Sequence, residues 1–597
     1  GVKGTGVPFT VRRLWSVVSG IWHGAWCIGH RVKTPCSMPF ALCFFLFTVH
    51  CSLTTVVYAY THDTSLIKWM EYSPEAFDRA KKEGKPIFMV ISAVWCYWCH
   101  VYEEKTLESK EVAEYINTNY IPIFIDYDRR KDIAARYPAA GLPTTVIFAP
   151  GGEEVVSSPG YIPKEKLLQN LQLTLKYIRE EFKPSAEARV EEPPEKGIII
   201  STKDDLSRVI TGFENILNSH YDPVFGGIGL REKEPRAEIF KYLLEVYEAN
   251  KDKKILEKVT TTLDYMAGMR QKPSKGKRPG FDYLSGLYKE KDKEDWLDKI
   301  ARLQQGHKIV GIYDPVEGGF FRYATRRDWT IPHYEKMLAD NGELIRLYLH
   351  AYKVTNNKRY REMVVKSLEY ILKNLYDPKD GRFHGSQDAD EIYYHLTLEE
   401  RKKVGSPRVD KTSYTATNAN AIITFLYAGD VLRDNRYKEI AIKALSFFSN
   451  KMITGDGVLS YYDGEKKQGF LNGQMEDNAW MVLAFLEGYG YTKDKRWLDR
   501  AEGLLGYILE RLYDSKNGGF YERRSTSREY YREGELFLKN KPYNLNGIMA
   551  YTLIRAYGFT KKEDYLKRAR ETMGAFQGVD PISPYFQKVA GYLLKKG

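Results

Sequence analysis

The sequence predicts a multidomain chain in which a mixed α/β unit precedes an all-α (α/α)6 toroid of helical hairpins. The first observation is the length of 597 residues, more than one domain usually holds. The second is that patterns typical of buried strands alternate with helical ones up to residue 182, whereas helical patterns alone follow residue 200. The third is that motifs in the helical part recur about every 68 residues, which indicates a repeat architecture.

The composition is that of an ordinary globular protein. Hydrophobic residues make up 43% and charged residues 28%, which argues against a disordered or polytopic membrane chain. The net charge is +12, and five of the basic residues lie in the first 59 residues, which hold no acid. Because Lys and Arg form no block elsewhere, we expect no nucleic-acid partner.

Residues 1–59 are interpreted as a leader. An uncharged apolar run at 38–59 follows basic residues and ends in Val57-Tyr58-Ala59, as in a signal peptide with a small-residue cleavage site. An uncleaved membrane anchor is the alternative. Either way we expect an exported protein, periplasmic or secreted, that contacts a membrane only if the leader stays attached. Residues 1–37 are interpreted as extra translated sequence upstream of Met38 and take no part in the fold prediction.

The α/β unit is predicted to span residues 60–182. Ser73-Pro74 opens an amphipathic helix with Phe77 and Ala80 inward, because Ser is a favoured N-cap and Pro suits the first helical position. The other elements follow in order: a strand at 86–91, a helical run to 116, strands at 121–126 and 144–148, a hairpin to 155–156 and a closing helix at 163–182.

The cysteines point to redox chemistry. Four of the six lie in the leader: Cys27, Cys36, Cys43 and Cys51. The remaining Cys-x-x-Cys pair, Cys96 and Cys99, lies between a strand and a helix, which is the thioredoxin arrangement. Since a helix N-terminus stabilises a thiolate, we expect Cys96 to attack a substrate disulfide and Cys99 to resolve the mixed disulfide.

A proline is predicted to shape the same site. Leu142-Pro143-Thr144 lies 47 residues after Cys96, where thioredoxin-like proteins place a cis-proline against the disulfide. The Gly-x-Pro-Thr entry into an apolar strand favours cis over the usual trans bond. Pro143 and Thr144 are therefore expected to support the redox site.

Two rival interpretations of the cysteine pair carry less weight. Cys-x-x-Cys-His is also the haem-attachment motif, but here it lies between strands rather than in a helical cytochrome. A structural zinc site needs two further ligands, and no second Cys or His pair stands nearby. We predict no metal and no cofactor.

The string Trp-Cys-x-Trp-Cys-His-Val, followed by Glu103, resembles the signature of the thioredoxin-like domain in the spermatogenesis-associated thioredoxin-domain proteins and their bacterial and archaeal relatives. Trp95 and His100 belong to this string and are expected to support the redox site. His100 either modulates Cys96 or is an ordinary helix residue.

The sequence departs from this pattern in two places. The segment around Leu142 is shorter and looks more like that of ordinary periplasmic thioredoxin-fold reductases. Val90 replaces the acid that thioredoxin carries six residues before its first cysteine. Glu103 is therefore the candidate proton acceptor for Cys99.

Residues 183–199, rich in proline and charge, are predicted to be a linker, and residues 200–597 the toroid. A loop that begins Tyr-Asp and turns through glycine recurs at Tyr221, Tyr313, Tyr376 and Tyr513. A second repeat starts with an asparagine before each of four apolar helices: Asn341, Asn418, Asn478 and Asn546. Each apolar helix precedes a striped one, which predicts an inner helix followed by an outer helix.

The helical pairs suggest a closed ring. Twelve helical segments are predicted between Asp204 and Phe576, with a short tail helix after Pro584. Six pairs form an (α/α)6 toroid, because no pair buries its apolar face alone. An open solenoid is the alternative.

The later sequence also resembles the second domain of the same family, which belongs with six-hairpin glycosidases and N-acylglucosamine 2-epimerase-like barrels. The resemblance lies in Gly311-Ile312-Tyr313-Asp314, Gly318-Gly319-Phe320, Arg322-Tyr323, Trp329, residues 332–341 and Asp388-Ala389-Asp390. The departures are an insertion of about 40 residues around Arg270–His307, judged by the repeat period, and Pro315 in place of a histidine.

Polar residues at one end of the inner helices are either caps or cavity groups. The toroid-cavity candidates are His333, Glu335, Asp340, Asn341, Asp388, Asp390 and Asp477. A glycoside hydrolase would use two of the carboxylates, and a sugar epimerase would use a histidine such as His333.

Three functions follow from these features. The preferred one is an exported thiol-disulfide oxidoreductase with a protein thiol or disulfide partner, in which the toroid binds or positions the partner. The second is a carbohydrate-active enzyme with a carbohydrate ligand in the toroid and an accessory thioredoxin-like domain. The third is a non-catalytic scaffold, which a closed apolar ring would favour.

Overall fold

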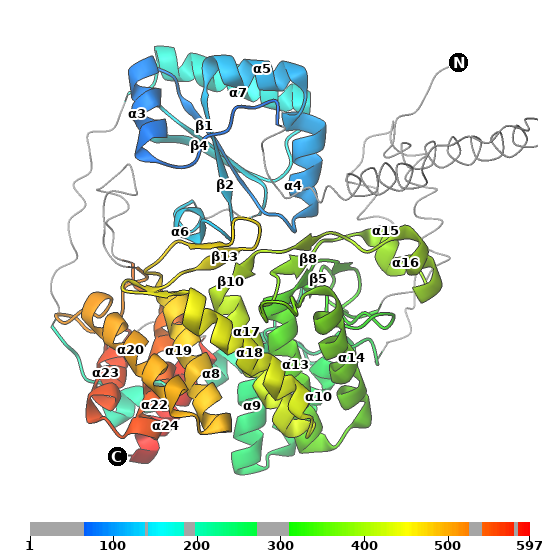
Figure 1. Ribbon diagram of the computed structural model, residues 1–597, viewed down its shortest axis with the longest axis vertical. Helices are drawn as coiled ribbons and strands as arrows, with labels where there is room; N and C mark the ends of the chain where they lie inside the picture. Colours follow the sequence, from blue (N-terminus) through cyan, green and yellow to red (C-terminus); the bar gives the residue numbers. More distant parts are fainter. Residues whose placement is uncertain are drawn as a thin grey trace, which may run out of the picture. The chain divides into compact units, whose positions relative to one another are not determined.

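The computed structural model describes residues 65–137, 141–183, 197–270, 310–523, 540–577 and 583–596 (Figure 1). Ser65–Gly597 forms one compact unit. The predicted leader, most of the linker and the insertion lie outside the described residues. Within the described ranges, no helix has both the length and the apolar character needed to cross a bilayer.

The α/β part contains a four-stranded sheet of order β2-β1-β3-β4. β1 (Ile87–Ser92) pairs in parallel with β2 (Ile121–Asp126) and antiparallel with β3 (Thr144–Phe148), which pairs with β4 (Glu154–Pro159). The first three strands are buried along almost their whole length, so their sequences are continuous apolar runs. The strands predicted from these runs are confirmed.

Helices flank the sheet. They are α3 (Pro74–Glu83), α4 (Tyr97–Tyr102), α5 (Lys110–Asn119), α6 (Lys131–Ala134) and α7 (Lys164–Glu180). Phe77 and Ala80 of α3 are buried in the core of the sheet, as predicted. The helical run after the cysteines is not continuous: α4 passes into a π-helical turn, Glu103–Leu107, before α5 begins.

The all-α part is a closed ring of helix pairs. The inner helices are α9 (Ala237–Asn250), α13 (Leu338–Thr355), α17 (Thr415–Val431), α19 (Met475–Thr492), α22 (Tyr543–Thr560) and α24 (Pro584–Lys596). Each contacts the next in this order, and α24 contacts α9. The predicted toroid is therefore confirmed over an open solenoid.

Each inner helix packs against one outer helix. The outer helices are α8 (Lys203–His220), α10 (Lys253–Met266), α14 (Lys358–Asn374), α18 (Asn435–Lys451), α20 (Lys495–Arg511) and α23 (Glu563–Gly574). The sequence predicts a tail helix after Pro584, whereas the structure uses this helix, α24, as the sixth inner helix and pairs it with α8. The first and last helices thus close the ring.

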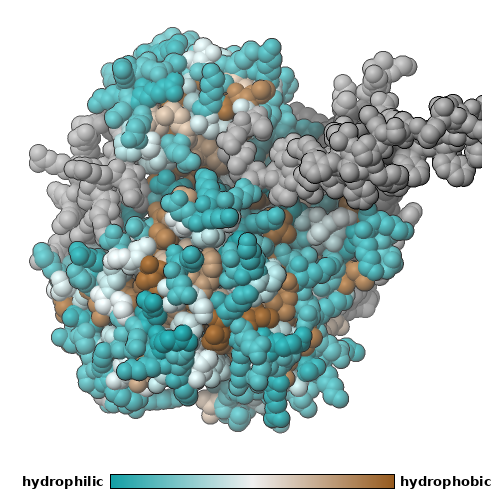
Figure 2. Space-filling model, in the orientation of Figure 1, coloured by the Kyte–Doolittle hydropathy of each residue, from teal (hydrophilic) through white to brown (hydrophobic). Residues whose placement is uncertain are grey.

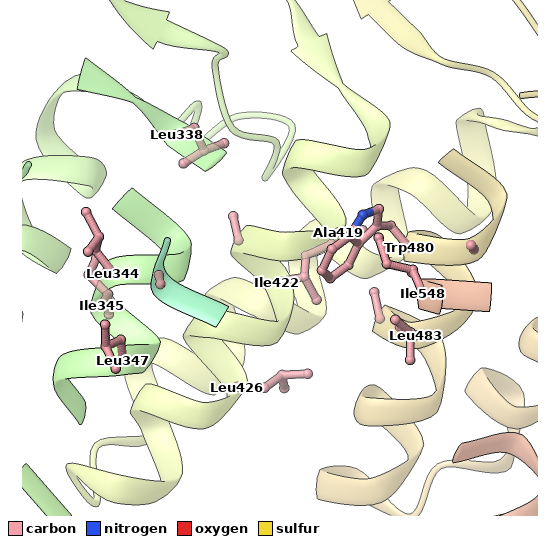
Figure 3. Packing of buried hydrophobic residues seen from close by; sticks show 14 of the residues in the cluster. Leu338, Leu344, Ile345, Leu347, Ala419, Ile422, Leu426, Trp480, Leu483 and Ile548 are labelled. Carbon is pink, nitrogen blue, oxygen red and sulfur yellow. The ribbon is translucent and has the colours of Figure 1, made fainter. Parts of the chain in front are cut away.

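The core is formed by the inner helices together with the inward faces of the outer helices. Leu347, Ile422 and Leu483, from three successive inner helices, are buried in it (Figure 3). The outer helices keep a polar face, and hydrophilic side chains cover most of the molecular face shown in Figure 2. The predicted contrast between apolar inner and striped outer helices follows from this burial.

Short strands and helices connect the ring helices. The strands are β5 (Tyr323–Ala324), β6 (Pro332–His333), β7 (Lys336–Met337), β8 (Ser386–Gln387), β9 (Val409–Asp410), β10 (Ser413–Tyr414), β11 (Ile453–Thr454), β12 (Gly457–Val458), β13 (Tyr461–Asp463) and β14 (Gln468–Phe470), and the helices are α15 (Glu391–His395) and α16 (Leu398–Val404). Because β7 and β10 lead directly into α13 and α17, these elements gather at the N-terminal ends of inner helices. The sequence did not predict these strands.

Candidate functional site

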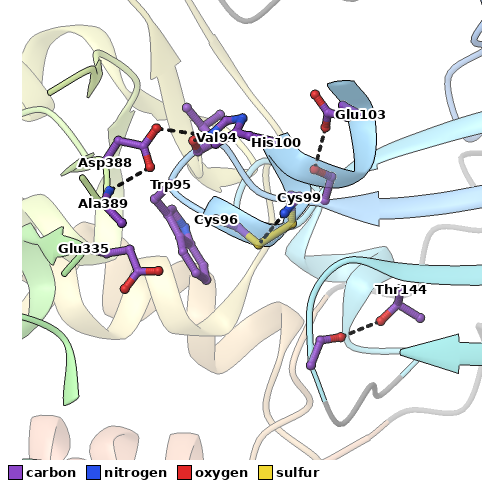
Figure 4. Close-up of a disulfide and its surroundings, with 12 residues drawn as sticks. Val94, Trp95, Cys96, Cys99, His100, Glu103, Thr144, Glu335, Asp388 and Ala389 are labelled. Atoms are coloured by element: carbon purple, nitrogen blue, oxygen red, sulfur yellow. Dashed lines mark hydrogen bonds and ion pairs between the residues drawn. A yellow bond between two sulfur atoms is a disulfide. The ribbon is translucent and has the colours of Figure 1, made fainter. Parts of the chain in front are cut away.

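Cys96 and Cys99 form a disulfide at the start of α4 (Figure 4). Cys96 is the N-cap of the helix, and the backbone N–H of Cys99 donates to Cys96 Sγ at 3.2 Å. Cys99 is fully buried, whereas Cys96 retains 6% of its surface. Of the two cysteines, the one with residual exposure is therefore the one that the sequence assigns to nucleophilic attack.

The proline turn has the predicted geometry. The Leu142-Pro143 peptide bond is cis. Thr144 Oγ1 donates to the carbonyl of Gly141 at 2.8 Å, which ties the two sides of the turn together. Leu142 packs against the buried cluster that contains both cysteines. The turn thus forms one wall of the disulfide site.

Glu103 lies on the turn of helix that follows α4. Its carboxylate accepts a hydrogen bond from Ser92 Oγ at 2.9 Å, at the end of β1. Val90 is fully buried between Phe124 and Thr145 on the neighbouring strands. The position that carries an acid in thioredoxin is therefore apolar in this protein. The role of Glu103 as proton acceptor for Cys99 remains a prediction.

His100 connects the disulfide helix to the ring. Its Nε2 lies 2.8 Å from the carbonyl of Val94 and 3.1 Å from Asp388 Oδ2. Burial disfavours the charged imidazole, but the Asp388 carboxylate outweighs it and raises the pKa of His100. Asp388, predicted as a cavity group, thus lies beside the disulfide helix.

Trp95 also joins the two parts. The guanidinium of Arg322 lies over its ring at 4.3 Å, and Trp95 Nε1 donates to Asp128 Oδ2 at 2.6 Å. Burial, together with the nearby Asp126 charge, raises the pKa of Asp128 to about 7. The sequence analysis did not identify Asp128. Because β1 and β2 are parallel, the residues that follow them, Trp95 and Asp128, lie at the same edge of the sheet, and this was the available signal.

A cavity of about 830 Å³ lies between the disulfide site and the ring. Trp95 and Cys96 line one side, and three predicted toroid residues line the other: His333, Glu335 and Asp340. Glu343, one turn after Asp340 on α13, also lines the cavity and was not predicted. The spacing of Asp340 and Glu343, three residues apart on a helix, is a signal that places both on one face.

The acids of this cavity are held in unusual environments. Burial raises the pKa of Asp340 to about 6, although the Arg322 charge opposes the rise. Burial and then the Glu238 charge raise the pKa of Glu343 to about 8. Glu335 is 3% exposed; its Oε1 lies 3.7 Å from His333 Nδ1, and its Oε2 accepts no hydrogen bond from the described residues.

Three predicted carboxylates do not line the large cavity. Asp390 instead caps α15 by accepting from the backbone N–H of Tyr393 at 2.9 Å. Asp477 accepts from Ser460 Oγ at 2.6 Å, pairs with Lys131 Nζ at 2.9 Å, and lines a separate cavity of about 380 Å³. Asp388 pairs with His100, as described above. Asp388 and Asp390 lie on the short connection between β8 and α15, whereas Asp477 lies in the first turn of α19 and faces the separate cavity.

Asn341 is also structural. α13 begins at Leu338, so Asn341 lies within the first turn and is not the N-cap. Its Oδ1 accepts from the backbone N–H of Phe320 at 2.7 Å, and its Nδ2 donates to the carbonyl of Phe320 at 2.9 Å. The side chain therefore fastens the preceding loop to the helix.

The fold and the disulfide define a protein in which a thioredoxin-like domain is followed by an (α/α)6 toroid. Residues 50–196 match a family model named Thioredox_DsbH and described as a protein of unknown function, DUF255. The chain is 25% identical to spermatogenesis-associated protein 20 of Mus musculus over 56% of this chain and 40% of that protein. It is thus a distant relative carrying a DUF255 domain, and the matched segment spans less than half of the mouse protein.

Other relatives match over more of their length. The human spermatogenesis-associated protein 20 is 21% identical, with 87% of this chain and 77% of that protein covered. An uncharacterized protein of Caenorhabditis elegans is 23% identical, with 86% and 72% covered.

Among solved structures, the chain is similar to cellobiose 2-epimerase from Spirochaeta thermophila, with 12% identity, a TM-score of 0.45, and 62% of this chain and 83% of that chain covered. It is also similar to a sugar epimerase from a ruminal bacterium, with 11% identity, a TM-score of 0.48, and 66% and 99% covered.

Proposed function

We propose that the protein is an exported thiol-disulfide oxidoreductase that uses Cys96 and Cys99 and binds its substrate or protein partner with the help of the ring. The observation that carries this proposal is the Cys96–Cys99 disulfide at the N-terminus of α4, with Cys96 on the wall of a cavity completed by ring residues. Export is proposed from the signal-peptide pattern of the leader.

The geometry supports a two-step exchange. In the reduced protein, the helix N-terminus stabilises a Cys96 thiolate, which attacks one sulfur of a substrate disulfide and expels the other as a thiol. Cys99 then attacks Cys96 Sγ, expels the second thiol and forms the protein disulfide. The two electrons of the dithiol pass to the substrate, and a dithiol reductant restores the protein. The opposite direction runs through the same mixed disulfide.

A trapping experiment tests the proposal. In a background with the four leader cysteines changed to Ser, Cys99→Ser should accumulate a mixed disulfide through Cys96 with a thiol-reactive probe disulfide, whereas Cys96→Ser should not. The reduced parent protein should also catalyse insulin reduction with dithiothreitol. Failure to trap the intermediate together with absence of insulin reduction would rule out the oxidoreductase.

A carbohydrate-active ring is the second proposal. The half-buried carboxylates of Asp340 and Glu343 support it, because acids with raised pKa values on a cavity wall suit general acid or base chemistry. The polar cavity also weighs against the scaffold alternative. A sugar panel should raise the melting temperature of the wild type and of Asp499→Asn, an exposed control on α20, but not of Asp340→Asn. No shift with any sugar would count against a carbohydrate ligand.

A further inference from the structure

The cavity beside Cys96 limits the size of what reaches its sulfur. Cys96 is 6% exposed, and the exposed part opens into the cavity of about 830 Å³. That volume lies in the range of small-molecule sites. A substrate disulfide must therefore enter the cavity to react, which favours a molecule of low mass.

The charged groups on the wall are mostly acidic. The acidic residues are Glu232, Glu234, Glu335, Asp340 and Glu343, of which Glu343 is protonated at neutral pH, and the cations are Arg236 and Arg322. Arg236 pairs with Glu234 at 2.6 Å, so these two charges offset each other. Arg322 lies over the Trp95 ring and is the remaining guanidinium among the described lining residues. The wall thus carries more negative than positive charge.

Glu335 supplies an unused acceptor in this wall. Its side chain is almost fully buried, and Oε2 has no hydrogen-bond partner among the described residues. A buried carboxylate oxygen without a partner is costly, and rotation of the Glu335 carboxylate into the cavity would let a bound cationic donor satisfy it. Figure 4 shows the Glu335 carboxylate directed towards the side on which Trp95 and Cys96 lie.

Glu343 gives independent support. Asn420 Nδ2 lies 3.4 Å from its Oε1, and burial with the Glu238 charge raises its pKa to about 8. The Glu343 side chain holds a proton at neutral pH because the nearby cations do not offset the effects of burial and of the Glu238 charge. An ammonium group in the cavity would favour its ionised form.

From the recessed sulfur and the acidic wall, we infer that the substrate of Cys96 is a disulfide of low mass that carries amino groups. This inference rests on the proposed oxidoreductase function. The Cys96 thiolate attacks one sulfur of the substrate and releases one aminothiol, and Cys99 releases the second as the protein disulfide forms. Two electrons pass from the protein dithiol to the substrate, and a dithiol reductant regenerates the protein.

The test is a single-turnover reaction with three probe disulfides of similar size. Cystamine carries two ammonium groups, bis(2-hydroxyethyl) disulfide is neutral, and 3,3′-dithiodipropionate carries two carboxylates. The reduced full chain, with leader cysteines changed to Ser, is mixed with each probe, quenched in acid, and alkylated for mass spectrometry of Cys96 and Cys99. Rates are divided by those of dithiothreitol with the same probe, which removes differences in intrinsic reactivity.

We expect the normalised rate with cystamine to exceed that with dithiodipropionate by about tenfold at low salt, and the preference to shrink as NaCl is raised. Glu335→Gln and Glu343→Gln should each lower the ratio of the cystamine rate to the neutral-probe rate. Glu362→Gln, an exposed control on α14, should keep the wild-type ratio.

The outcomes separate the two proposals. If the neutral probe oxidises the pair but the normalised cystamine and dithiodipropionate rates agree within about twofold, the inference about substrate charge is overturned and the oxidoreductase stands. If Glu335→Gln and Glu343→Gln both retain the wild-type ratio, the inference is likewise overturned. If no probe reacts faster than with the urea-unfolded chain, the oxidoreductase itself fails.

Discussion

At the scale of single residues, His100 connects the redox helix to a carboxylate that lies 288 positions later in the chain. The interaction explains why a histidine next to the cysteine pair need not be an ordinary solvent-facing helix residue. Its side chain is 23% exposed, so the Asp388 charge is only partly screened by water. The ring thereby sets the charge state of a residue beside Cys99.

Replacing Asp388 tests this coupling. Asp388→Asn should lower the pKa of His100, because the carboxylate that favours imidazolium is lost, whereas Glu104→Gln at an exposed site should leave it close to wild type. A raised histidine pKa stabilises the folded protein below the unfolded pKa, and this stabilisation disappears as pH rises through the folded value. A histidine NMR titration measures the change. An unaltered His100 titration in Asp388→Asn would contradict the assignment.

The raised pKa of Asp128 gives a stability prediction of the same sign for a carboxyl group. Its pKa is raised to about 7 by burial and by Asp126, so the folded state holds a proton that the unfolded chain loses near pH 4. Its contribution to stability is therefore present below pH 4 and disappears as pH rises through about 7. Relative to Asp128→Asn, the wild type should lose on the order of 2 kcal/mol between pH 4 and 8.

Urea unfolding of both proteins across that pH range measures the effect. In Asp128→Asn the amide oxygen replaces the carboxylate as the acceptor for Trp95 Nε1, so the hydrogen bond of 2.6 Å is kept. Parallel pH profiles for wild type and Asp128→Asn would show that Asp128 titrates normally.

At the scale of elements, the repeated asparagines join each loop to the helix that follows. Each asparagine side chain accepts a hydrogen bond from a backbone N–H group in the preceding loop. The pairs are Asn341 with Phe320 at 2.7 Å, Asn418 with Phe383 at 2.8 Å, Asn478 with Val458 at 3.1 Å, and Asn546 with Phe520 at 2.7 Å. The sequence showed the repeat of asparagines, but the residue that each one binds lies 20 to 35 positions upstream along the chain. In three of the four cases the side-chain amide bonds both backbone groups of one residue, and Asn478 instead donates to the carbonyl of Gln474; an amide carries both a donor and an acceptor, which explains the use of Asn.

Asn341→Ala should destabilise the ring by about 3 kcal/mol, because it leaves buried backbone groups of Phe320 without partners. Asn218→Ala, an exposed asparagine that bonds the Lys258 side chain, should cost less than about 0.5 kcal/mol. Urea midpoints followed by tryptophan fluorescence compare the two. Equal costs at both positions would show that Asn341 is not a fastening residue.

At the scale of the whole molecule, ion pairs hold the thioredoxin-like part to the ring. Lys131 of α6 lies 2.8 Å from Glu476 and 2.9 Å from Asp477, and Arg129 lies 3.4 Å from Asp463. Asp477 is 1% exposed, so Lys131 compensates a buried charge. These contacts place the disulfide opposite the cavity residues of the ring.

Lys131→Ala should cost about 3 kcal/mol by leaving Asp477 without its cation. The double variant Lys131→Met with Asp477→Asn should recover a large part of that loss, because it removes both charges. Lys164→Ala breaks an exposed pair with Glu111 and should cost under about 1 kcal/mol. A double-mutant cycle on urea midpoints measures the coupling. Additive losses would mean that Lys131 and Asp477 do not stabilise each other.

The sequence by itself determined the strands of the α/β sheet, the Cys-x-x-Cys pair at the start of α4, the cis-proline turn and most helix pairs of the ring. These depend on local signals: apolar runs, turn residues, and the periodic burial of helix faces. It also placed His333, Glu335 and Asp340 on the ring cavity, because residues before and within the first turn of α13 share one end of the ring.

Only the tertiary structure decided which acids face Cys96. Asp388 and Asp390 lie on the connection between β8 and α15 and have other partners there. Asp477 lies at the start of an inner helix, as Asp340 does, but it pairs with Lys131 instead of facing Cys96. The closing role of α24 likewise depends on α8, almost four hundred residues earlier along the chain. Contacts between distant segments set burial and charge environment, and a local pattern holds no information about which segments meet.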